Sequence, residues 1–585
     1  MSDVIEQGKS AVGIRNDVNA LTLNKAPRLV PVGCNTDFPF QLSSATVTAG
    51  QQVGFRSMHY FPKGGKGIRL LIPAGWYANA NETANTSAFP LKMSVENSSP
   101  PWGPAKAYAP GDTVVYYATQ AGSGTYQNNP FFTCVTGNTN SPPKPGNANW
   151  AYGSRKQSWP VTASGVQSCS AITVTLPNGS TVTQAFILSD VLPIEVPVGG
   201  WMAIYYHFIC SGSQVFPTLG NPQPLSLGTW FENGASVTDR TPQSGSVGLP
   251  RTAASPTFTP IAILGQPLVT TKTAVIIGDS IAHGISGGAN LLAVSIVSGG
   301  AGYEVGDRLT LGRNGATAGA VAAGGDAQVI VDNVSAGVVT ALRIVNTGSY
   351  TSTASQTGQT LPTGTIGTTG GTGTGCTLSA TFATNPSDIG DQETGAQGWL
   401  RRGLSELGIP HATYAAPGDR LNLWTAAAAP SSTGRVATIA QYNADIAIVA
   451  LGRNDLSASD SAATILANFT KLIAMLRGLG FSKVIGCTIT MEVTSTAADG
   501  CSTLAAQTVT ANDAARQTVN AAMRAGTTGF DAIIDDAALV EDGGASAPTG
   551  KWAIIGGLPS AADGKHPGVS AHIAMAGAVV AEMFV

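Results

Sequence analysis

Three residue types that can cooperate in acyl transfer, a serine, a histidine and an aspartate, stand in this sequence in settings that favour chemistry. Ser280 lies in GDSI, directly after the apolar run VII (275–277), so it emerges where a buried strand would end. A serine hydroxyl is a weak nucleophile unless a neighbouring base removes its proton, and that base needs an orienting carboxylate. Near the other end of the sequence, DGKHP places Asp563 three residues before His566, and in a turn these side chains can meet. These residue types indicate nucleophilic catalysis.

Two more positions could stabilise the negative charge that develops on a carbonyl oxygen during acyl transfer. Asn454 lies in GRND directly after the apolar run ADIAIVAL, and Gly418 lies in AAPGDR after another strand-like run. Such an oxyanion needs hydrogen-bond donors aimed at it. The backbone N–H groups of Ser280 and Gly418 and the side-chain amide of Asn454 would supply three. Arg453, also in GRND, could reach an anionic group of a substrate.

The four blocks GDSI, AAPGDR, GRND and DGKHP, in this order, resemble those of the SGNH (GDSL-type) serine hydrolases. The resemblance covers about 270–290 and 388–585, roughly a third of the chain. It implies a flavodoxin-like, three-layer α/β/α fold and a Ser–His–Asp site that hydrolyses carboxylic esters and requires no metal or organic cofactor. The first two blocks are far apart, which is explained if a segment at 290–387 is looped out.

The resemblance implies a role for each matching residue. By position, Ser280 is the nucleophile, His566 is the base and Asp563 orients that base. Gly418 and Asn454 complete the oxyanion hole together with the N–H group of Ser280.

Each of these residues alone also has an ordinary structural interpretation. Asn454 would more often be a helix cap or a turn residue, Gly418 a turn glycine and His566 a surface histidine. Only their joint occurrence, at strand ends and in the expected terminal loop, favours the catalytic interpretation. Asp279 and Asp419 each follow a glycine at a strand end, where an aspartate commonly caps a helix or stabilises a turn. We assign neither of them to catalysis.

After residue 270 the sequence alternates between strand-like and helix-like patterns. The predicted strands are TAVIIGD (273–279), HATYAAP (411–417), ADIAIVALG (444–452), KVIGCTIT (483–490) and FDAIIDD (530–536). Helical patterns occupy 395–408, 461–480 and 510–526, and a last apolar helix follows DGKHP. Near-continuous Val, Ile and Ala runs between helices indicate a parallel sheet covered on both faces. Its carboxyl edge, where ligands bind in open α/β sheets, would carry Ser280, Gly418 and Asn454.

The sequence before residue 270 indicates another fold class. Short β-type runs alternate with turn clusters there, and no convincing helical pattern appears between about 30 and 265. We therefore predict a multidomain protein with an all-β part and an α/β part. The predicted parts are an N-terminal segment (1–30), a jelly-roll-like β-sandwich (31–99 and 156–268), a small β insertion (100–155), the SGNH hydrolase domain (269–289 and 388–585) and an inserted β-repeat domain (290–387).

The two insertions resemble known modules. Residues 100–155 are similar to small chitin-binding-type carbohydrate modules, and Trp102, Tyr108 and Trp150 are the candidates for stacking on a sugar. The alternative is that these rings form the core of a mini-domain, and the sequence leaves both interpretations open. The insertion at 290–387 contains an internal echo, AVSIVSGGAGY and ALRIVNTGSY, and looks like repeats of bacteriophage tail and other virion proteins.

Composition narrows the classes of partner. Charged residues make up 11% of the chain and the net charge is −3, so no basic surface for nucleic acid is indicated. No apolar stretch is long enough to span a membrane, and the start of the sequence lacks the apolar core of a secretory signal. Seven scattered cysteines without a CxxC pair indicate neither a disulfide framework nor a zinc site. These features favour assembly in a reducing cytoplasm, with release by lysis.

Together, the resemblances predict a phage tail-associated serine esterase that removes O-acetyl groups from a host capsule or lipopolysaccharide. Its expected partners are that polysaccharide and other virion tail proteins, and a homo-oligomer such as a trimer is expected only by analogy with tail fibres. One alternative is a structural or adhesive virion protein whose hydrolase-like domain only binds, which a blocked Ser280 would indicate. Another is a bacterial lipase or thioesterase, but no lid-like amphipathic helix supports it.

Overall fold

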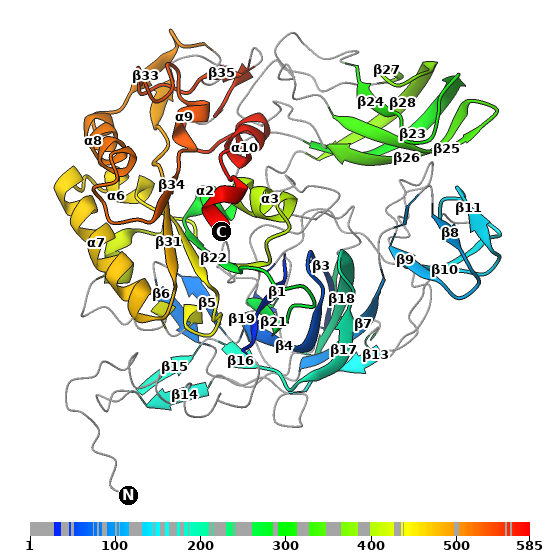
Figure 1. The fold of residues 1–585 in the computed structure, drawn as a ribbon, viewed down its shortest axis with the longest axis horizontal. Coiled ribbons are helices and arrows are strands. Elements are labelled where there is room, and N and C mark those ends of the chain that lie inside the picture. The colour runs from blue at the N-terminus through cyan, green and yellow to red at the C-terminus, as the bar shows by residue number, and fades with distance from the viewer. Residues whose placement is uncertain are drawn as a thin grey trace, which may run out of the picture.

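Figure 1 shows the computed structural model of the chain. The structure describes residues 28–34, 36, 46–47, 52–73, 75–78, 81–84, 91–99, 102–103, 106–115, 131–143, 147–152, 158–162, 172–175, 181–184, 186–209, 214–215, 230–237, 239, 241, 260–284, 290–312, 327–346, 364–383, 398–425, 435–436, 438–495, 501, 503–555, 558–561 and 564–585. Most of the predicted N-terminal segment (1–30) therefore lies outside the described residues, and so does Asp563.

The α/β region is built on one sheet of five parallel strands in the order β29-β22-β30-β31-β34. The strands are β22 (Ala274–Gly278), β29 (His411–Ala415), β30 (Ile446–Ala450), β31 (Lys483–Cys487) and β34 (Ala532–Ile534). Every residue of β22 is buried, because Val275 and Ile277 enter one hydrophobic cluster while Ala274 and Ile276 enter another. The five strands predicted from the sequence thus form one sheet that is covered on both faces.

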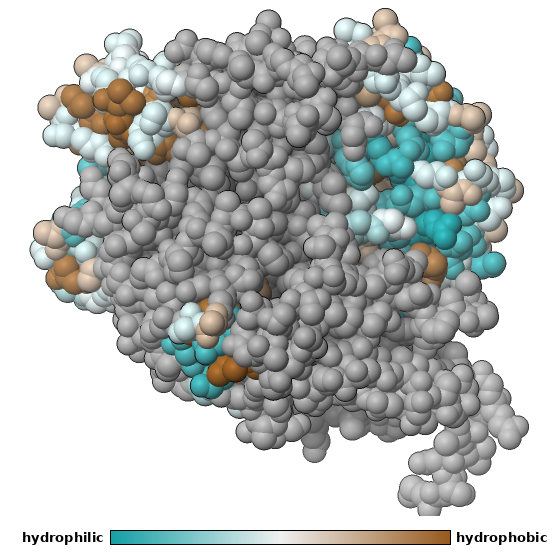
Figure 2. Space-filling view, turned by 180° about the vertical axis from the view of Figure 1, so that it is seen from behind, coloured by the Kyte–Doolittle hydropathy of each residue, from teal (hydrophilic) through white to brown (hydrophobic). Residues whose placement is uncertain are grey.

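Helices cover both faces of this sheet (Figure 1). On one face lie α4 (Leu421–Thr425), α7 (Ala462–Gly478) and α8 (Asp513–Arg524); on the other lie α3 (Trp399–Glu406), α9 (Ala537–Val540), α10 (Val569–Ala576) and the 3₁₀ helix η2 (Ala581–Phe584). Helix α7 buries Ile465, Phe469, Leu472 and Leu476, which lie on one face at helical spacing. Figure 2 shows hydrophilic side chains gathered on the side of the molecule that carries α7 and α8. No helix among the described residues is long and apolar enough to cross a membrane.

The region before the parallel sheet contains two larger antiparallel sheets. One has the order β13-β7-β18-β3-β20; in the other, β1, β21, β4 and β16 follow one another and β17 also pairs with β4. The strands are β1 (Val30–Gly33), β3 (Gln52–Phe61), β4 (Gly65–Pro73), β7 (Leu91–Ser99), β13 (Ser158–Pro160), β16 (Phe186–Leu188), β17 (Leu192–Val196), β18 (Gly200–Ile209), β20 (Trp230–Gly234) and β21 (Ala262–Gln266). Phe55 and Ile204 of the first sheet share a hydrophobic cluster with Ile68 and Ile263 of the second, so both sheets contribute to one core.

Short antiparallel pairs of strands accompany these sheets. The pairs are β2 (Thr46–Val47) with β19 (Gln214–Val215), β5 (Gly75–Ala78) with β6 (Asn81–Ala84), β14 (Ile172–Thr175) with β15 (Thr181–Gln184), β32 (Val493–Ser495) with β33 (Gln507–Val509), and β35 (Ile554–Ile555) with β36 (Leu558–Pro559). The last two pairs lie in the α/β region and adjoin the loop that carries His566.

The sheet that contains β21 packs against the parallel sheet, a contact that the sequence pattern does not predict. Successive side chains of a strand point to opposite faces. In β21, Ile263 enters the core between the two antiparallel sheets, while Leu264 enters the same cluster as Tyr414 and Trp424 of the α/β region. Strands β1 and β21 both contact β29, the edge strand of the parallel sheet. Strands therefore cover part of a face that we expected helices to cover.

Among the described residues between β22 and α3, six strands form a separate antiparallel sheet in the order β23-β28-β27-β24-β25-β26. The strands are β23 (Asn290–Ala301), β24 (Arg308–Leu311), β25 (Gln328–Ser335), β26 (Val338–Asn346), β27 (Ile366–Thr369) and β28 (Thr374–Ala383). Leu309, Val329 and Leu378 belong to a hydrophobic cluster that contains only residues of this segment. The sheet lies apart from the parallel sheet (Figure 1), so the insertion lengthens the chain between Ser280 and Gly418 without entering the α/β core.

The small β insertion buries the aromatic rings that were candidates for sugar stacking. Its strands are β8 (Ala107–Tyr108), β9 (Thr113–Val115), β10 (Phe131–Cys134), β11 (Asn138–Thr139) and β12 (Trp150–Tyr152). Trp102, Tyr108 and Trp150 are only 7%, 4% and 5% exposed and form one cluster. Tyr108 meets Trp150 edge-on at 5.2 Å between ring centroids, and Trp150 Nε1 donates to Ser141 O at 2.7 Å. Of the two interpretations that the sequence leaves open, the structure supports the second, in which these rings form the core of the mini-domain, because so small a domain needs them there.

Candidate active site

The turn after β22 presents Ser280 at the carboxyl edge of the parallel sheet. Helix α2 (Ser280–His283) begins one residue after the end of the strand. The turn requires glycine at 278, because a Cβ atom there would lie 2.2 Å from the Cβ of Ala282. Asp279 caps the helix, its carboxylate accepting from the N–H of Ile281 at 2.9 Å. The N–H of Ser280, at the first position of the helix, has no acceptor within the helix and is one of the predicted oxyanion donors.

The structure brings His566 to Ser280 although the two residues lie 286 positions apart. His566 Nε2 and Ser280 Oγ are 3.0 Å apart, which is hydrogen-bonding distance. The loop that carries the histidine is held by the carbonyl of Gly564, which accepts from Val493 N at 3.0 Å and from Trp552 Nε1 at 2.9 Å. Asp563 lies outside the described residues, so its position behind the imidazole stays a prediction.

Gly418 and Asn454 lie next to each other at the same edge of the sheet. Gly418 has a φ of 78°, a conformation that glycine adopts without strain, and a Cβ atom there would meet open space. Asn454 lies in the short helix α6 (Arg453–Ser457) after β30, and its Nδ2 donates to the carbonyl of Asp419 at 3.1 Å. This contact uses one of the two amide hydrogens of Asn454. The other hydrogen and the N–H of Gly418 are the predicted oxyanion donors.

Buried carboxylates hold the turn that contains Gly418. Asp419 is fully buried and accepts hydrogen bonds from Trp424 Nε1 at 2.9 Å and from Arg435. Asp455 accepts from the N–H of Leu421 with both carboxylate oxygens, at 3.0 and 3.1 Å. These contacts agree with the interpretation of Asp419 as a turn-stabilising residue. Because Asp455 follows Asn454 directly, it also ties α6 to the segment that follows Gly418.

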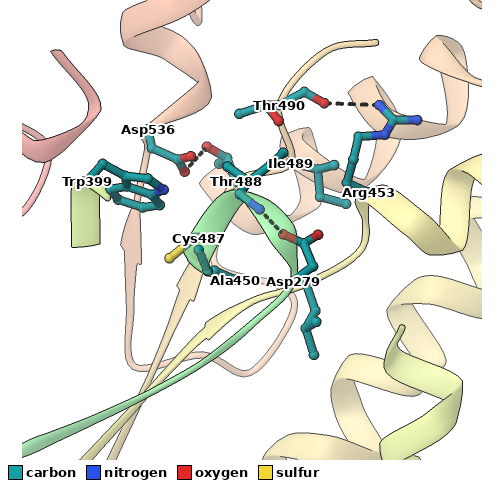
Figure 3. Close-up of a pocket in the computed structure, with 12 residues that line it drawn as sticks. Asp279, Trp399, Ala450, Arg453, Cys487, Thr488, Ile489, Thr490 and Asp536 are labelled. Atoms are coloured by element: carbon teal, nitrogen blue, oxygen red, sulfur yellow. Dashed lines mark hydrogen bonds between the residues drawn. The ribbon is translucent and has the colours of Figure 1, made fainter. Parts of the chain in front are cut away.

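Arg453 does not point toward a substrate, contrary to the expectation from the sequence. Its side chain is 3% exposed; it donates to Thr490 O at 3.0 Å and pairs with Glu492 at 3.1 Å. Figure 3 shows Arg453 directed toward Thr490 at the rim of a small pocket. The guanidinium is therefore a structural link between α6 and the segment after β31.

A pocket beside the nucleophile turn contains residues that sequence reasoning missed. It has a volume of about 20 Å³, and its lining includes Asp279, Trp399, Thr488 and Asp536 (Figure 3). Thr488 Oγ1 donates to Asp536 at 3.0 Å. Burial raises the pKa of Asp279 to about 6 and that of Asp536 well above its usual range. Both residues fall near the ends of the predicted strands 483–490 and 530–536, whereas the observed strands end earlier: Thr488 directly follows β31 and Asp536 lies two residues after β34. The strand-end rule that singled out Asn454 would have found them had these strand ends been predicted correctly.

The pKa of Asp455 makes the stability of this region depend on pH. Burial raises that pKa to about 7, although the hydrogen bond from Leu421 lowers it. Because the unfolded value is about 3.9, the protonated carboxyl contributes most below about pH 4, and this stability is lost as the pH rises through 7. We expect Asp455→Asn, which cannot titrate, to lose less thermal stability than the natural protein between about pH 5 and pH 8. An equal fall of the unfolding midpoint in both proteins would contradict this assignment.

The fold and this constellation define the class of the domain, an α/β domain with a Ser–His pair at the carboxyl edge of a parallel sheet. Residues 370–553 match the model of the GDSL-like lipase/acylhydrolase family. The chain therefore contains a GDSL-like acylhydrolase domain. The matched range includes Gly418 and Asn454, begins after Ser280 and ends before His566. The six-stranded insertion accounts for the separation of Ser280 from this range.

Several solved structures are similar to parts of the chain. A GDSL-like lipase from Bacteroides thetaiotaomicron is 12% identical, with a TM-score of 0.23, and the match covers 32% of this chain and 81% of that one. An acetylxylan esterase from Geobacillus stearothermophilus is 16% identical (TM-score 0.22; 32% and 81% covered). A carbohydrate esterase family 3 protein from Talaromyces cellulolyticus is 17% identical (TM-score 0.20; 29% and 70% covered). No curated protein matches the chain.

Proposed function

We propose that the protein is a serine esterase whose acyl-transfer site consists of Ser280, His566 and Asp563. The observation that carries this proposal is the distance of 3.0 Å between Ser280 Oγ and His566 Nε2 at the carboxyl edge of the parallel sheet. The match to the GDSL-like acylhydrolase family supports the hydrolase class. Gly418 and Asn454, which follow the two strands that flank β22 at the same edge of the sheet, are the proposed oxyanion donors.

The proposed reaction proceeds through an acyl-enzyme. Ser280 Oγ attacks the carbonyl carbon of the ester while His566 Nε2 takes the hydroxyl proton. The oxyanion accepts hydrogen bonds from the N–H groups of Ser280 and Gly418 and from the Asn454 amide. His566 then gives its proton to the leaving alcohol oxygen as the C–O bond breaks. A water molecule, deprotonated by His566, attacks the acyl group and releases the carboxylate and free Ser280.

We propose that the natural substrate is an O-acetyl group on a host capsule or lipopolysaccharide, and that the protein works in a phage tail. The resemblance of the 290–387 insertion to virion repeats and the low charge of the chain support this proposal. The proposed partners are the host polysaccharide and other tail proteins, with a trimer as the proposed assembly by analogy with tail fibres. Because the rings of the small β insertion are buried, polysaccharide binding is not assigned to Trp102, Tyr108 or Trp150.

Two measurements test this proposal. A fluorophosphonate probe reacts only with an activated serine, so we expect it to label Ser280, identified by mass spectrometry of the labelled peptide. A panel of acetylated bacterial glycans, each paired with its chemically deacetylated form, should release acetate only from the acetylated member. Labelling without acetate release from any glycan would overturn the polysaccharide assignment. Absence of labelling would overturn the esterase itself.

A second function, attachment through a hydrolase-like domain without catalysis, is favoured by one observation. Ser280 is only 6% exposed, as a blocked nucleophile would be. The same probe separates the two functions, because a serine that a substrate cannot reach does not react. Glycan binding without labelling would support attachment.

A further inference from the structure

Glu492 lies between the two halves of the candidate site and binds side chains from both. Its carboxylate accepts from Lys565 Nζ at 2.6 Å, from Arg453 Nη2 at 3.1 Å and from Ser457 Oγ at 2.9 Å. The side chain of Glu492 is 19% exposed and that of Lys565 is 29% exposed, so both are largely shielded from solvent. One carboxylate therefore holds three donors from two separate segments.

Two of these three donors are the immediate neighbours of proposed functional residues. Arg453 directly precedes Asn454, the proposed oxyanion donor, in α6. Lys565 directly precedes His566, the proposed base, in the loop after β36. Two ion pairs that meet at Glu492 thus join the histidine loop to α6.

The backbone of Glu492 is anchored as well. Its carbonyl accepts from Thr510 Oγ1 at 3.0 Å, and the carbonyl of Thr490, two residues earlier, accepts from Arg453 Nη1 at 3.0 Å. The backbone from which the Glu492 side chain extends is therefore held in place, so its carboxylate can contact both α6 and the histidine loop from a fixed position. A fixed carboxylate can position a loop, whereas a freely rotating one cannot.

We propose that Glu492 is a positioning residue of the esterase, which holds His566 in register with Ser280 and Asn454 by pairing with Lys565 and Arg453. This inference rests on the proposed function of the same site. Neither Glu492 nor Lys565 was a candidate from the sequence, since Glu492 lies in none of the four blocks and Lys565 occupies an unassigned position of DGKHP.

The carboxylate of Glu492 remains ionised over the pH range in which a histidine titrates. Burial opposes ionisation of Glu492, but the hydrogen bond from Lys565 and the charge of Arg453 outweigh it and lower the pKa of the carboxyl. The pairing is therefore complete above the pKa of an unfolded glutamate, about 4.3, and is lost only as the pH falls through the lowered value. Near neutral pH, the carboxylate balances the ammonium group beside His566.

Removing Glu492 or Lys565 should shift the pH dependence of activity in a direction that electrostatics predicts. His566 must be uncharged to accept the proton of Ser280, so activity rises with pH along the acid limb of the profile. Glu492→Gln leaves the Lys565 ammonium unbalanced, which disfavours the imidazolium and moves the acid limb to lower pH. Lys565→Met removes a positive charge beside His566, which favours the imidazolium and moves the limb to higher pH. Asp279 also faces His566, while Asp513 and Arg516 face Arg453; none of these three changes in the variants.

The test is steady-state hydrolysis of 4-nitrophenyl acetate by the full-length protein across the acid limb. We expect Glu492→Gln to lower kcat about 3–10-fold with KM within about twofold, since only positioning is lost. Its acid limb should move down by a few tenths of a pH unit, about the size expected for one partly screened charge, and that of Lys565→Met should move up. In the double variant Glu492→Gln with Lys565→Met, the acid limb should lie at the same pH as in the natural protein.

Glu406→Gln is the matched control, because Glu406 accepts from Arg402 at 2.8 Å near the amino edge of the sheet, away from His566. The inference would be overturned if the acid limbs of both Glu492→Gln and Lys565→Met lay at the same pH as the acid limb of Glu406→Gln. Lys565→Met keeps Glu492 paired with Arg453, so it provides the test if Glu492→Gln unfolds. If the natural protein neither hydrolysed the ester nor reacted with the probe, the proposed function itself would be overturned. That outcome differs from the case in which the variants are active but their acid limbs do not shift, which overturns only the role of Glu492.

Discussion

Ser280→Ala is expected to lose about 10⁴–10⁶-fold in kcat for 4-nitrophenyl acetate, the range typical of a removed nucleophile in a Ser–His site. The substitution removes the attacking oxygen but changes little else, because the turn geometry depends on Gly278 and the helix cap on Asp279. The fold should therefore be retained, with an unchanged far-ultraviolet circular dichroism spectrum and thermal midpoint. The fluorophosphonate label should disappear together with the activity.

Ser482→Ala is the matched control for this variant. Ser482 also carries a hydroxyl that makes one hydrogen bond, to Asp445 O at 3.0 Å, but it lies before β31, at the amino end of the sheet. Its variant should hydrolyse the ester at the natural rate. Hydrolysis by Ser280→Ala at the rate of this control would reject Ser280 as the nucleophile and leave the Ser–His contact as a structural hydrogen bond.

Asn454→Ala is expected to lower kcat by about 10²–10³-fold, the cost of one missing oxyanion donor. KM should change little, because the lost hydrogen bond forms only when charge develops on the substrate oxygen. The contact between Asn454 Nδ2 and Asp419 O supports this role, since it directs the amide toward the turn that carries Gly418.

A second variant distinguishes donation from packing at this position. Asn454→Asp has nearly the same shape but no amide donor, and its negative charge would repel an oxyanion. It should therefore be at least as impaired as Asn454→Ala. If Asn454→Asp kept the natural kcat, the side chain would only fill space, and Gly418 and Ser280 would have to stabilise the oxyanion alone.

The predictions that succeeded rest on local patterns. The five parallel strands were visible as apolar runs, because a strand buried on both faces has almost no polar positions. Ser280, Gly418 and Asn454 could be placed at one edge because parallel strands end on the same side. Thr488 and Asp536 lie at the same edge but were missed because they fall within the predicted strands 483–490 and 530–536, which extend past the ends of β31 and β34.

The predictions that failed depend on distant partners. Arg453 was considered for substrate binding, but it pairs with Glu492, a residue in another segment, and is buried there. Trp102 and Trp150 have side chains that suit either a sugar-binding surface or a core. The choice depends on how little other apolar material so small a domain contains.

The amino-acid sequence by itself determined the strand–turn blocks, the glycine at 278 and the spacing that sets an aspartate three positions before a histidine, because backbone geometry and apolar periodicity act over a few residues. Only the tertiary structure decided that His566 meets Ser280 across 286 positions, that β21 packs on the α/β region, and that Glu492 joins Arg453 to Lys565. Such contacts depend on the packing of whole elements, and residue spacing along the chain carries no information about the distances that packing produces.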